Sequence, residues 1–448
     1  MKTITCFVAM LLATCASTFA QTGSTGTWRV EGVGAGPWTL ALRADGPRLT
    51  GKVSSCTSLP VEIDEGRIAG NSLSFKCKSP DGDRVITFRG SINGDEIMLT
   101  WDKQVREGGA PFPALNSLDV GDRNASDALR TGDRSHDMFG ASTPRQLTAR
   151  RVPDGGVEFA AALNLPQKGM KVEGTLFVPP NVKRVRAVIV LLNSGFSWNG
   201  MGGSFYLDPQ LRRLAETLEA GLYLPRITNI GPLHIDLLRN AALGGADGLI
   251  SLLSRLAQES GHPEIASAPL LLWGHSRTGH FAATFAALHP QRTIALVAYH
   301  SGGAGLAGAD MKALIDVPAL HLQARSDIER GRAGTGAPDF AETSWKQARS
   351  LGAPWTFGIE PDAVHQNPAD LAKANDLVIP WIAAVVRQRL SNDGPSLRTV
   401  TEGSGWLGDT QTRDVAPFAT FTHSKPDANW LPDEASARGW LIVTGARQ

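Results

Sequence analysis

Two patterns of hydrophobic and polar positions follow one another along the chain. From Thr27 to Trp101, short alternating runs are separated by turn pairs such as Asp45-Gly46 and Asn93-Gly94, which is typical of antiparallel hairpins. The strands that we expect are Thr27–Val33, Trp38–Ala44, Arg48–Ser54, Ser72–Lys78, Arg84–Gly90 and Glu96–Trp101. Residues 21–105 are therefore predicted to form a small antiparallel β barrel or sandwich.

The second pattern begins after residues 106–150, which are rich in Gly, Asp, Ser and Arg and predict a linker. Beyond them, strand-like and helix-like runs alternate as in parallel βαβ units, so an α/β domain is expected over 151–390. Its expected strands are Lys171–Val178, Ala187–Leu192, Gly221–Leu224, Pro269–Trp273, Ile294–Tyr299, Ala319–Gln323 and Thr356–Ile359. Its expected helices are Leu211–Ala220, Leu237–Ser260, Arg277–Leu288, Phe340–Ser350 and Leu371–Leu390. The tail, 391–448, contains three tryptophans and is expected to pack onto this domain.

The first 20 residues have the features of a secretory signal peptide. Lys2 precedes an apolar stretch from Phe7 to Ala13, and small residues precede Gln21. We therefore expect an exported protein, secreted or periplasmic. The alternative is lipoprotein anchoring at Cys15, although a Thr directly before this Cys is atypical.

Composition and charge exclude several classes of partner. With 44 basic and 43 acidic residues, the net charge of +1 gives no electrostatic reason to expect nucleic acid or an anionic membrane as partner. No later segment reaches the roughly 20 apolar residues of a membrane span.

In an oxidising compartment, Cys56 and Cys77 would form one disulfide, with two buried thiols as the alternative. Nucleotide, dinucleotide and zinc-protease motifs are absent from the sequence, so neither metal nor cofactor is expected.

The strongest chemical signal is an apolar strand, Leu270–Trp273, that runs through Gly274-His275-Ser276 into an Ala-rich helix. A strand, sharp turn and helix around a Ser form a nucleophile elbow, whose helix N-terminus favours the negative charge that develops during acyl transfer. A helix-capping Ser after a glycine turn is the plainer alternative. The segment resembles the α/β-hydrolase superfamily, in particular its secreted serine esterases, except that Thr278 replaces the second Gly of G-x-S-x-G and Gly279 follows it.

This resemblance implies a doubly wound, mostly parallel sheet and a catalytic order of Ser, acid and His. Asp327, in the loop after the strand at 319–323, takes the place of the acid, with Glu329 as the alternative. His365, after the last strand, takes the place of the base. Its competitor is His300, which would line or pack the site. His275 and His280 are expected to pack or support the elbow.

The same resemblance implies an oxyanion hole and a function. The backbone N–H groups of Arg277 and Phe196, with Gly195 next, would bind the oxyanion. Apart from the resemblance, His300 and also Trp198, which begins a segment rich in Gly and aromatic residues, are candidates for the substrate pocket. We expect an exported serine esterase that acts through an acyl-enzyme on a small or polymer-linked ester. The alternatives are a secreted serine peptidase of the same fold and a catalytically silent protein whose β domain binds glycan or lipid.

Overall fold

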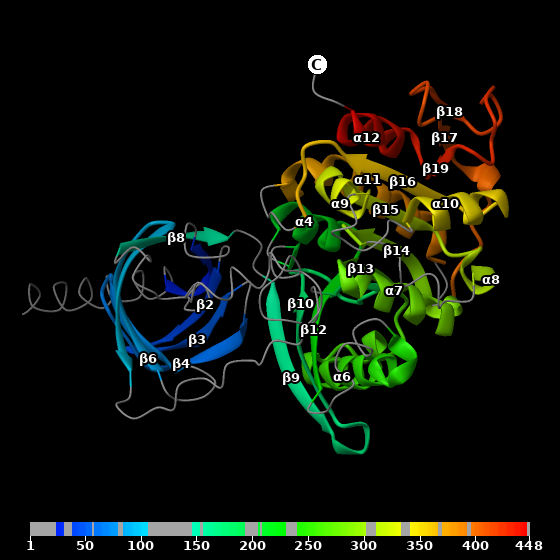
Figure 1. Cartoon of the computed structure of the whole chain (residues 1–448). Coiled ribbons are helices and arrows are strands. Elements are labelled where there is room, and N and C mark those ends of the chain that lie inside the picture. The colour runs from blue at the N-terminus through cyan, green and yellow to red at the C-terminus, as the bar shows by residue number, and fades with distance from the viewer. Residues whose placement is uncertain are drawn as a thin grey trace, which may run out of the picture. The chain divides into compact units, whose positions relative to one another are not determined.

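The structure is a computed structural model of the whole chain (Figure 1). It describes residues 24–30, 38–55, 58–78, 84–105, 146–152, 156–192, 205–206, 208–229, 240–301, 311–332, 341–365, 370–391 and 396–445. The chain divides into two compact units, which are Met1–Gly155 and Gly156–Gln448. The predicted signal peptide with Cys15, and also Cys56, Gly195, Phe196 and Trp198, lie outside the described residues.

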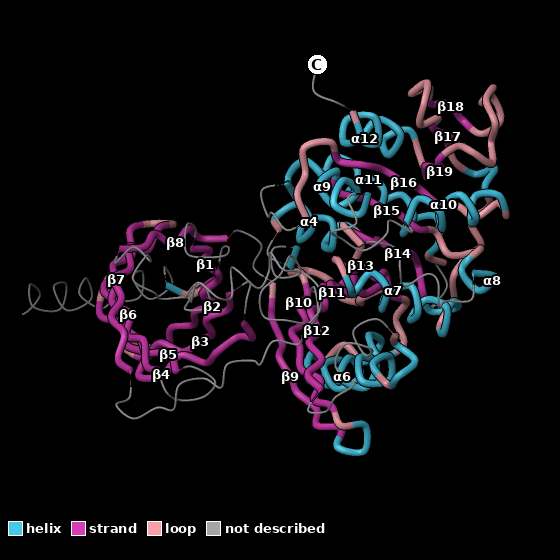
Figure 2. The backbone as a smooth tube through the Cα atoms, in the orientation of Figure 1, coloured by secondary structure: helices cyan, strands magenta, loops and turns pink. Residues whose placement is uncertain are grey.

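The first unit is a closed barrel of eight antiparallel strands (Figure 2). They are β1 (Gly26–Val30), β2 (Trp38–Asp45), β3 (Arg48–Ser55), β4 (Ser58–Ala69), β5 (Ser72–Lys78), β6 (Arg84–Asn93), β7 (Glu96–Val105) and β8 (Gln146–Val152). Alternate residues of β5, namely Leu73, Phe75 and Cys77, are buried in an apolar core that also contains Trp28 and Phe88. Side chains can fill an eight-stranded barrel, which fits this core.

Strand β8 corrects the predicted linker, which was expected to run to residue 150. Its residues pair with both β1 and β7, and this pairing closes the barrel. Leu147 and Ala149 are buried between more exposed neighbours, which is the alternation of a strand. The alternation is short and interrupted by Arg150 and Arg151, so it was easily mistaken for linker sequence. Strand β4 was also not predicted.

The expected disulfide between Cys56 and Cys77 is not found. Cys77 is a free, buried thiol. Its side chain belongs to the apolar core of the barrel, and this burial raises the pKa of the thiol to about 12. The prediction relied on the redox compartment alone and did not consider that Cys77 occupies a core position of β5.

The second unit is built on an eight-stranded sheet of order β16-β15-β14-β13-β11-β12-β10-β9. The strands are β9 (Val157–Leu165), β10 (Met170–Val178), β11 (Ala187–Leu192), β12 (Ala220–Asn229), β13 (Leu270–His275), β14 (Thr293–Tyr299), β15 (Ala319–Ala324) and β16 (Trp355–Glu360). Along this order, each pair of neighbouring strands from β16 through β11 to β12 is parallel. Strand β10 pairs antiparallel with both β9 and β12. The expected mostly parallel sheet is confirmed, and β9 is an addition at its edge.

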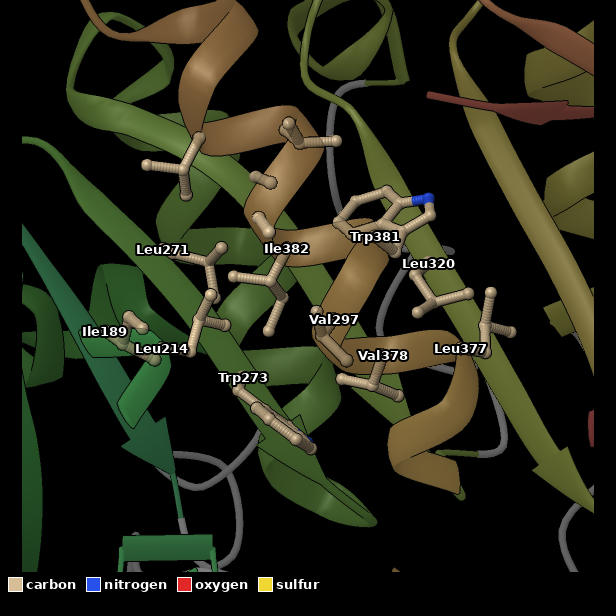
Figure 3. Close-up of a cluster of buried hydrophobic side chains, with 14 of the residues drawn as sticks. Ile189, Leu214, Leu271, Trp273, Val297, Leu320, Leu377, Val378, Trp381 and Ile382 are labelled. Carbon is tan, nitrogen blue, oxygen red and sulfur yellow. The ribbon is translucent and has the colours of Figure 1, made fainter. Parts of the chain in front are cut away.

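Helices cover both faces of this sheet. They are α4 (Pro209–Thr217), α6 (Gly245–Ser260), α7 (Arg277–Leu288), α8 (Met311–Leu314), α9 (Arg325–Arg332), α10 (Ala341–Ser350), α11 (Leu371–Arg389) and α12 (Glu434–Thr444). Figure 3 shows Trp381 and Ile382 of α11 against Leu271, Val297 and Leu320 of the strands. The alternate strand residues Leu270 and Leu272 pack on the opposite face with α6 and α7. This period of two places a core on each face.

Helix α6 is shorter than the predicted Leu237–Ser260. It begins at Gly245 because Gly244 before it has a φ of 101°, a left-handed conformation that interrupts a right-handed helix. Among the described helices, none is long and apolar enough to cross a membrane.

The C-terminal residues pack against the large sheet and the helices within the second unit. They form a small sheet of β17 (Trp406–Gly408), β18 (Val415–Pro417) and β19 (Asn429–Leu431), followed by α12. The indole nitrogen of Trp440 donates to the carbonyl oxygen of Phe357 in β16 at 2.9 Å. Arg349 of α10 is buried and donates to Glu402 of the tail at 2.6 Å. These contacts join the tail to the edge strand and to α10.

Candidate active site

Ser276 lies at a sharp turn between β13, which ends at His275, and α7, which begins at Arg277. Its φ of 56° and ψ of −124° are strained for a residue with a side chain, a conformation that costs about 1–3 kcal/mol. Two backbone hydrogen bonds hold the turn, from Ser276 N–H to Tyr299 O and from Gly279 N–H to Ser276 O, both at 3.1 Å. Such strain commonly marks a functional position.

Two glycines give the turn its space. A Cβ atom at Gly274 would lie 2.4 Å from the carbonyl oxygen of Thr278, and one at Gly279 would lie 2.4 Å from the hydroxyl of Ser301. Both positions therefore exclude a side chain. The close approach of α7 to the end of β14 falls at Gly279, one residue after the usual second Gly of the motif.

Thr278 occupies that usual Gly position and is fully buried. Its hydroxyl oxygen accepts from His275 N–H at 3.1 Å and lies 2.8 Å from the carbonyl oxygen of Leu192, to which it donates. The carbonyl oxygen of His275 is a second acceptor, at 2.9 Å. The departure from G-x-S-x-G thus adds a hydrogen-bonded link between the elbow and the end of β11.

His365 reaches the elbow from the segment that follows β16. Its Nε2 lies 3.0 Å from the Ser276 hydroxyl oxygen, within the range of a nucleophile–base hydrogen bond. The His365 side chain is 34% exposed, so solvent reaches the pair. The N–H of Val364 donates to the Asp370 carboxylate at 3.2 Å, which fixes the preceding residue.

Asp327 completes this chain of contacts. Its Oδ2 accepts from His365 Nδ1 at 2.8 Å. It lies in the first turn of α9, directly after β15, and not in the loop that the sequence predicted. Glu329, the alternative acid, is exposed on the same helix. An acceptor at Nδ1 places the hydrogen of a neutral imidazole there and leaves Nε2 free to take a proton from Ser276.

His275 and His300 both contact the main chain of His365. Both donate to the carbonyl oxygen of His365, and His300 also contacts Glu360 at 2.7 Å. His300 is buried, so its contacts are those of a packed residue and not of a residue exposed in a substrate pocket. Sequence reasoning missed Glu360, the one acidic residue of the otherwise apolar and uncharged strand β16.

The predicted oxyanion donors are only partly described. Arg277 is the first residue of α7, where backbone N–H groups point out of the helix N-terminus and favour an anion. Phe196, Gly195 and Trp198 lie outside the described residues. Within the described part of the chain, no group of three or more His, Cys, Asp or Glu residues could hold a metal ion.

The order of these residues along the sheet identifies the fold of the larger unit. A central strand leads into the Ser elbow, and the acid and the His follow later parallel strands in the order Ser276, Asp327, His365. The larger unit has the α/β-hydrolase fold. The sequence-based expectation of this fold, preceded by a small β domain, is confirmed.

No protein-family model and no curated protein matches the sequence. Among solved structures, the S-formylglutathione hydrolase of Agrobacterium tumefaciens is 15% identical, over 53% of this chain and 98% of that chain, with a TM-score of 0.38. That of Staphylococcus aureus is 14% identical, over 51% and 99%, with a TM-score of 0.36. The dienelactone hydrolase of Anabaena variabilis is 22% identical, over 51% and 97%, with a TM-score of 0.34. The assignment of the α/β-hydrolase fold therefore rests on the sheet and elbow of this chain.

Proposed function

We propose that this protein is a serine hydrolase that cleaves carboxylic esters through an acyl-enzyme. The observation that carries the proposal is the continuous chain of hydrogen bonds from Ser276 through His365 to Asp327, at 3.0 Å and 2.8 Å. It lies at a strained elbow in the α/β-hydrolase fold. A Ser hydroxyl is a weak nucleophile near neutral pH and requires such a base and such an orienting group.

The first half of the reaction forms the acyl-enzyme. His365 Nε2 takes the hydroxyl proton while the Ser276 oxygen bonds to the ester carbonyl carbon, and Asp327 stabilises the imidazolium that results. When the tetrahedral intermediate collapses, the carbon–oxygen bond to the alcohol breaks, and His365 gives its proton to the departing alcohol. In the second half, water gives a proton to His365 and attacks the acyl carbon. The acid leaves, and Ser276 recovers its proton.

The negative oxygen of each intermediate requires donors that are placed in advance. The first proposed donor is the backbone N–H of Arg277, at the positive end of α7. We propose Phe196 N–H, or else Gly195 N–H, as the second. Loss of one such donor typically costs about 3 kcal/mol of transition-state stabilisation.

We also propose that the protein is exported, on the evidence of its N-terminal sequence alone. The free thiol of Cys77 removes the cysteine pair as support for this proposal. Fractionation of cells that express the full chain, with N-terminal sequencing of the product, tests it. A protein that keeps Met1 and stays in the cytoplasm would contradict export.

The decisive experiment compares the wild-type protein with Ser276→Ala and Ser254→Ala. Ser254 is a partly buried Ser of α6 that donates to its own helix and serves as the matched control. The substrates are p-nitrophenyl acetate, p-nitrophenyl butyrate and methyl ferulate. We expect turnover of these esters to disappear only in Ser276→Ala. A fluorophosphonate should label the wild-type protein and Ser254→Ala, but not Ser276→Ala.

Three other outcomes would redirect the assignment. Turnover that survives in Ser276→Ala would remove Ser276 as the nucleophile. Labelling of Ser276 together with cleavage of peptides but not of esters would indicate a peptidase. Neither labelling nor turnover in the wild-type protein would favour a catalytically silent binding protein.

A further inference from the structure

Three buried side chains next to the base have no part in the proposed chemistry. The carbonyl oxygen of His365 lies 2.9 Å from His275 Nε2 and 3.1 Å from His300 Nδ1. The Nε2 atom of His300 lies 2.7 Å from Oε2 of Glu360. His275, His300 and Glu360 are 0%, 1% and 4% exposed. The residue that carries the base is thus held through its main chain by a buried polar cluster.

The chemistry of these atoms determines where the hydrogens lie. A carbonyl oxygen only accepts, so both ring nitrogens that face it must carry hydrogen. His275 is therefore protonated at Nε2, and it is neutral near pH 7 because burial, with a contribution from His365, lowers its pKa to about 3. His300 is protonated at Nδ1, which leaves its Nε2 toward Glu360. One proton must lie in that contact, since two lone pairs would otherwise face each other.

The surroundings of this contact change the acidity of Glu360. Burial raises the pKa of Glu360, and the nearby carboxylate of Asp370 adds to the effect, whereas His300 opposes it. The ring of Tyr299 stacks on His300 with centroids 3.9 Å apart. The contact between His300 and Glu360 is thus buried and closely packed.

The backbone at His300 is strained. Its φ of 46° lies in the left-handed region, which costs a residue with a Cβ atom about 1–3 kcal/mol. The N–H of His300 donates to Leu322 O at 2.7 Å, so the end of β14 stays fixed to β15 in this conformation. The strained backbone directs the ring to the carbonyl oxygen of His365.

We propose that His275, His300 and Glu360 are positioning residues that hold the main chain of His365 and so keep its Nε2 directed at the Ser276 hydroxyl. This inference rests on the proposed serine hydrolase function. None of the three needs to touch the substrate. Glu360 fixes the hydrogen of His300 on Nδ1, and the two histidines saturate the two lone pairs of one carbonyl oxygen.

The test uses paired substitutions that keep or remove a donor. His300→Asn retains an amide N–H near the position of Nδ1, whereas His300→Leu retains only bulk. Glu360→Gln can still form a hydrogen bond with His300 Nε2 through its amide group, whereas Glu360→Leu cannot. We expect the Leu variants to lose about 10- to 100-fold in kcat, with little change in KM, because a small misplacement of the base slows the chemical step. The Asn and Gln variants should retain most of kcat.

Two further measurements separate positioning from general damage. Active-site titration with a fluorophosphonate gives the fraction of folded, competent enzyme, so that kcat refers to that fraction alone. The acid limb of the pH profile of kcat/KM reports the ionisation of the base in the free enzyme. It should move in the Leu variants and stay in place in Glu360→Gln. A fold that is merely destabilised would lower the competent fraction and leave the limb unchanged.

Ser276→Ala, measured in parallel, separates failure of this inference from failure of the proposed function. Full activity in Ser276→Ala would overturn the proposed function. Inactivity of Ser276→Ala together with wild-type kcat in His300→Leu would overturn the positioning role only. If His300→Leu and Glu360→Leu do not fold, the kcat values of His300→Asn and Glu360→Gln decide whether the positioning role holds. A loss of about tenfold or more in folded His300→Asn and Glu360→Gln would also overturn the inference.

Discussion

Thr278→Val removes one hydroxyl group from the elbow and changes little else, since the two side chains have nearly the same shape. The hydroxyl accepts from His275 N–H at 3.1 Å and donates to Leu192 O at 2.8 Å. Thr278 is fully buried, so water cannot easily replace either partner. The substitution therefore tests whether the departure from the usual Gly strengthens the turn or is only tolerated.

The expected loss follows from these contacts. Each hydrogen bond contributes about 1 kcal/mol net, and a buried N–H left without an acceptor costs about 1–3 kcal/mol. We expect Thr278→Val to lower the free energy of unfolding of the larger unit by about 2–4 kcal/mol, or its Tm by about 4–8 °C. The activity should also fall, because the same hydrogen bonds fix the peptide next to Ser276.

Scanning calorimetry of the wild-type protein, Thr278→Val and Thr278→Ser provides the assay, with the fraction labelled by a fluorophosphonate at each temperature as a probe of the larger unit. Thr278→Ser keeps the hydroxyl and loses one methyl group, which costs about 1 kcal/mol. A Val variant within about 0.5 kcal/mol of the wild type, or a Ser variant less stable than the Val variant, would refute the assigned role of the hydroxyl.

Two further predictions concern Asp327, the proposed acid, and a buried histidine. Asp327→Asn should lower kcat by about 10³- to 10⁴-fold, because an amide at His365 Nδ1 no longer fixes the required tautomer. Glu329→Gln, at an exposed residue, should not lower kcat. Equal losses of steady-state kcat in the two variants would remove Asp327 as the acid. His321 is fully buried in β15, and burial lowers its pKa to about 4 from 6.5. The unfolded chain therefore binds a proton that the folded chain excludes, and stability that is present above pH 6.5 is lost as the pH falls toward 4, by up to about 3 kcal/mol. Urea unfolding between these pH values should show a shallower pH dependence for His321→Leu than for the wild type, and identical slopes would contradict the assignment.

The fold could be predicted because the period of the apolar residues changes along the chain. Strands β11, β13 and β15 are buried on both faces, and β11 and the first four residues of β13 appear as short continuous apolar runs. Strand β8 was missed because Leu147 and Ala149 are the only buried core residues among those of β8 whose burial is described, and its partner β1 lies far away in the sequence. Barrel closure depends on such distant pairing, which local periodicity does not report.

The candidate site divides in the same way. Ser276, Asp327 and His365 each follow a strand of a parallel sheet, and the order of such strands brings their ends together, so position in the sequence was informative for them. The contacts of Thr278 could not be found in this way. Its hydroxyl donates to Leu192 O at 2.8 Å, and Thr278 in α7 is distant in the sequence from Leu192 at the end of β11.

Glu360 is the residue for which a sequence signal existed and was not used. It ends β16, in which every other residue is apolar or uncharged. A carboxyl group in a strand that a sheet buries requires a partner, because an unpaired buried charge is strongly unfavourable. His300 is that partner, at 2.7 Å. An acidic residue that ends a buried strand is therefore reason to look for a buried partner, and here that partner, His300, also contacts the carbonyl oxygen of His365.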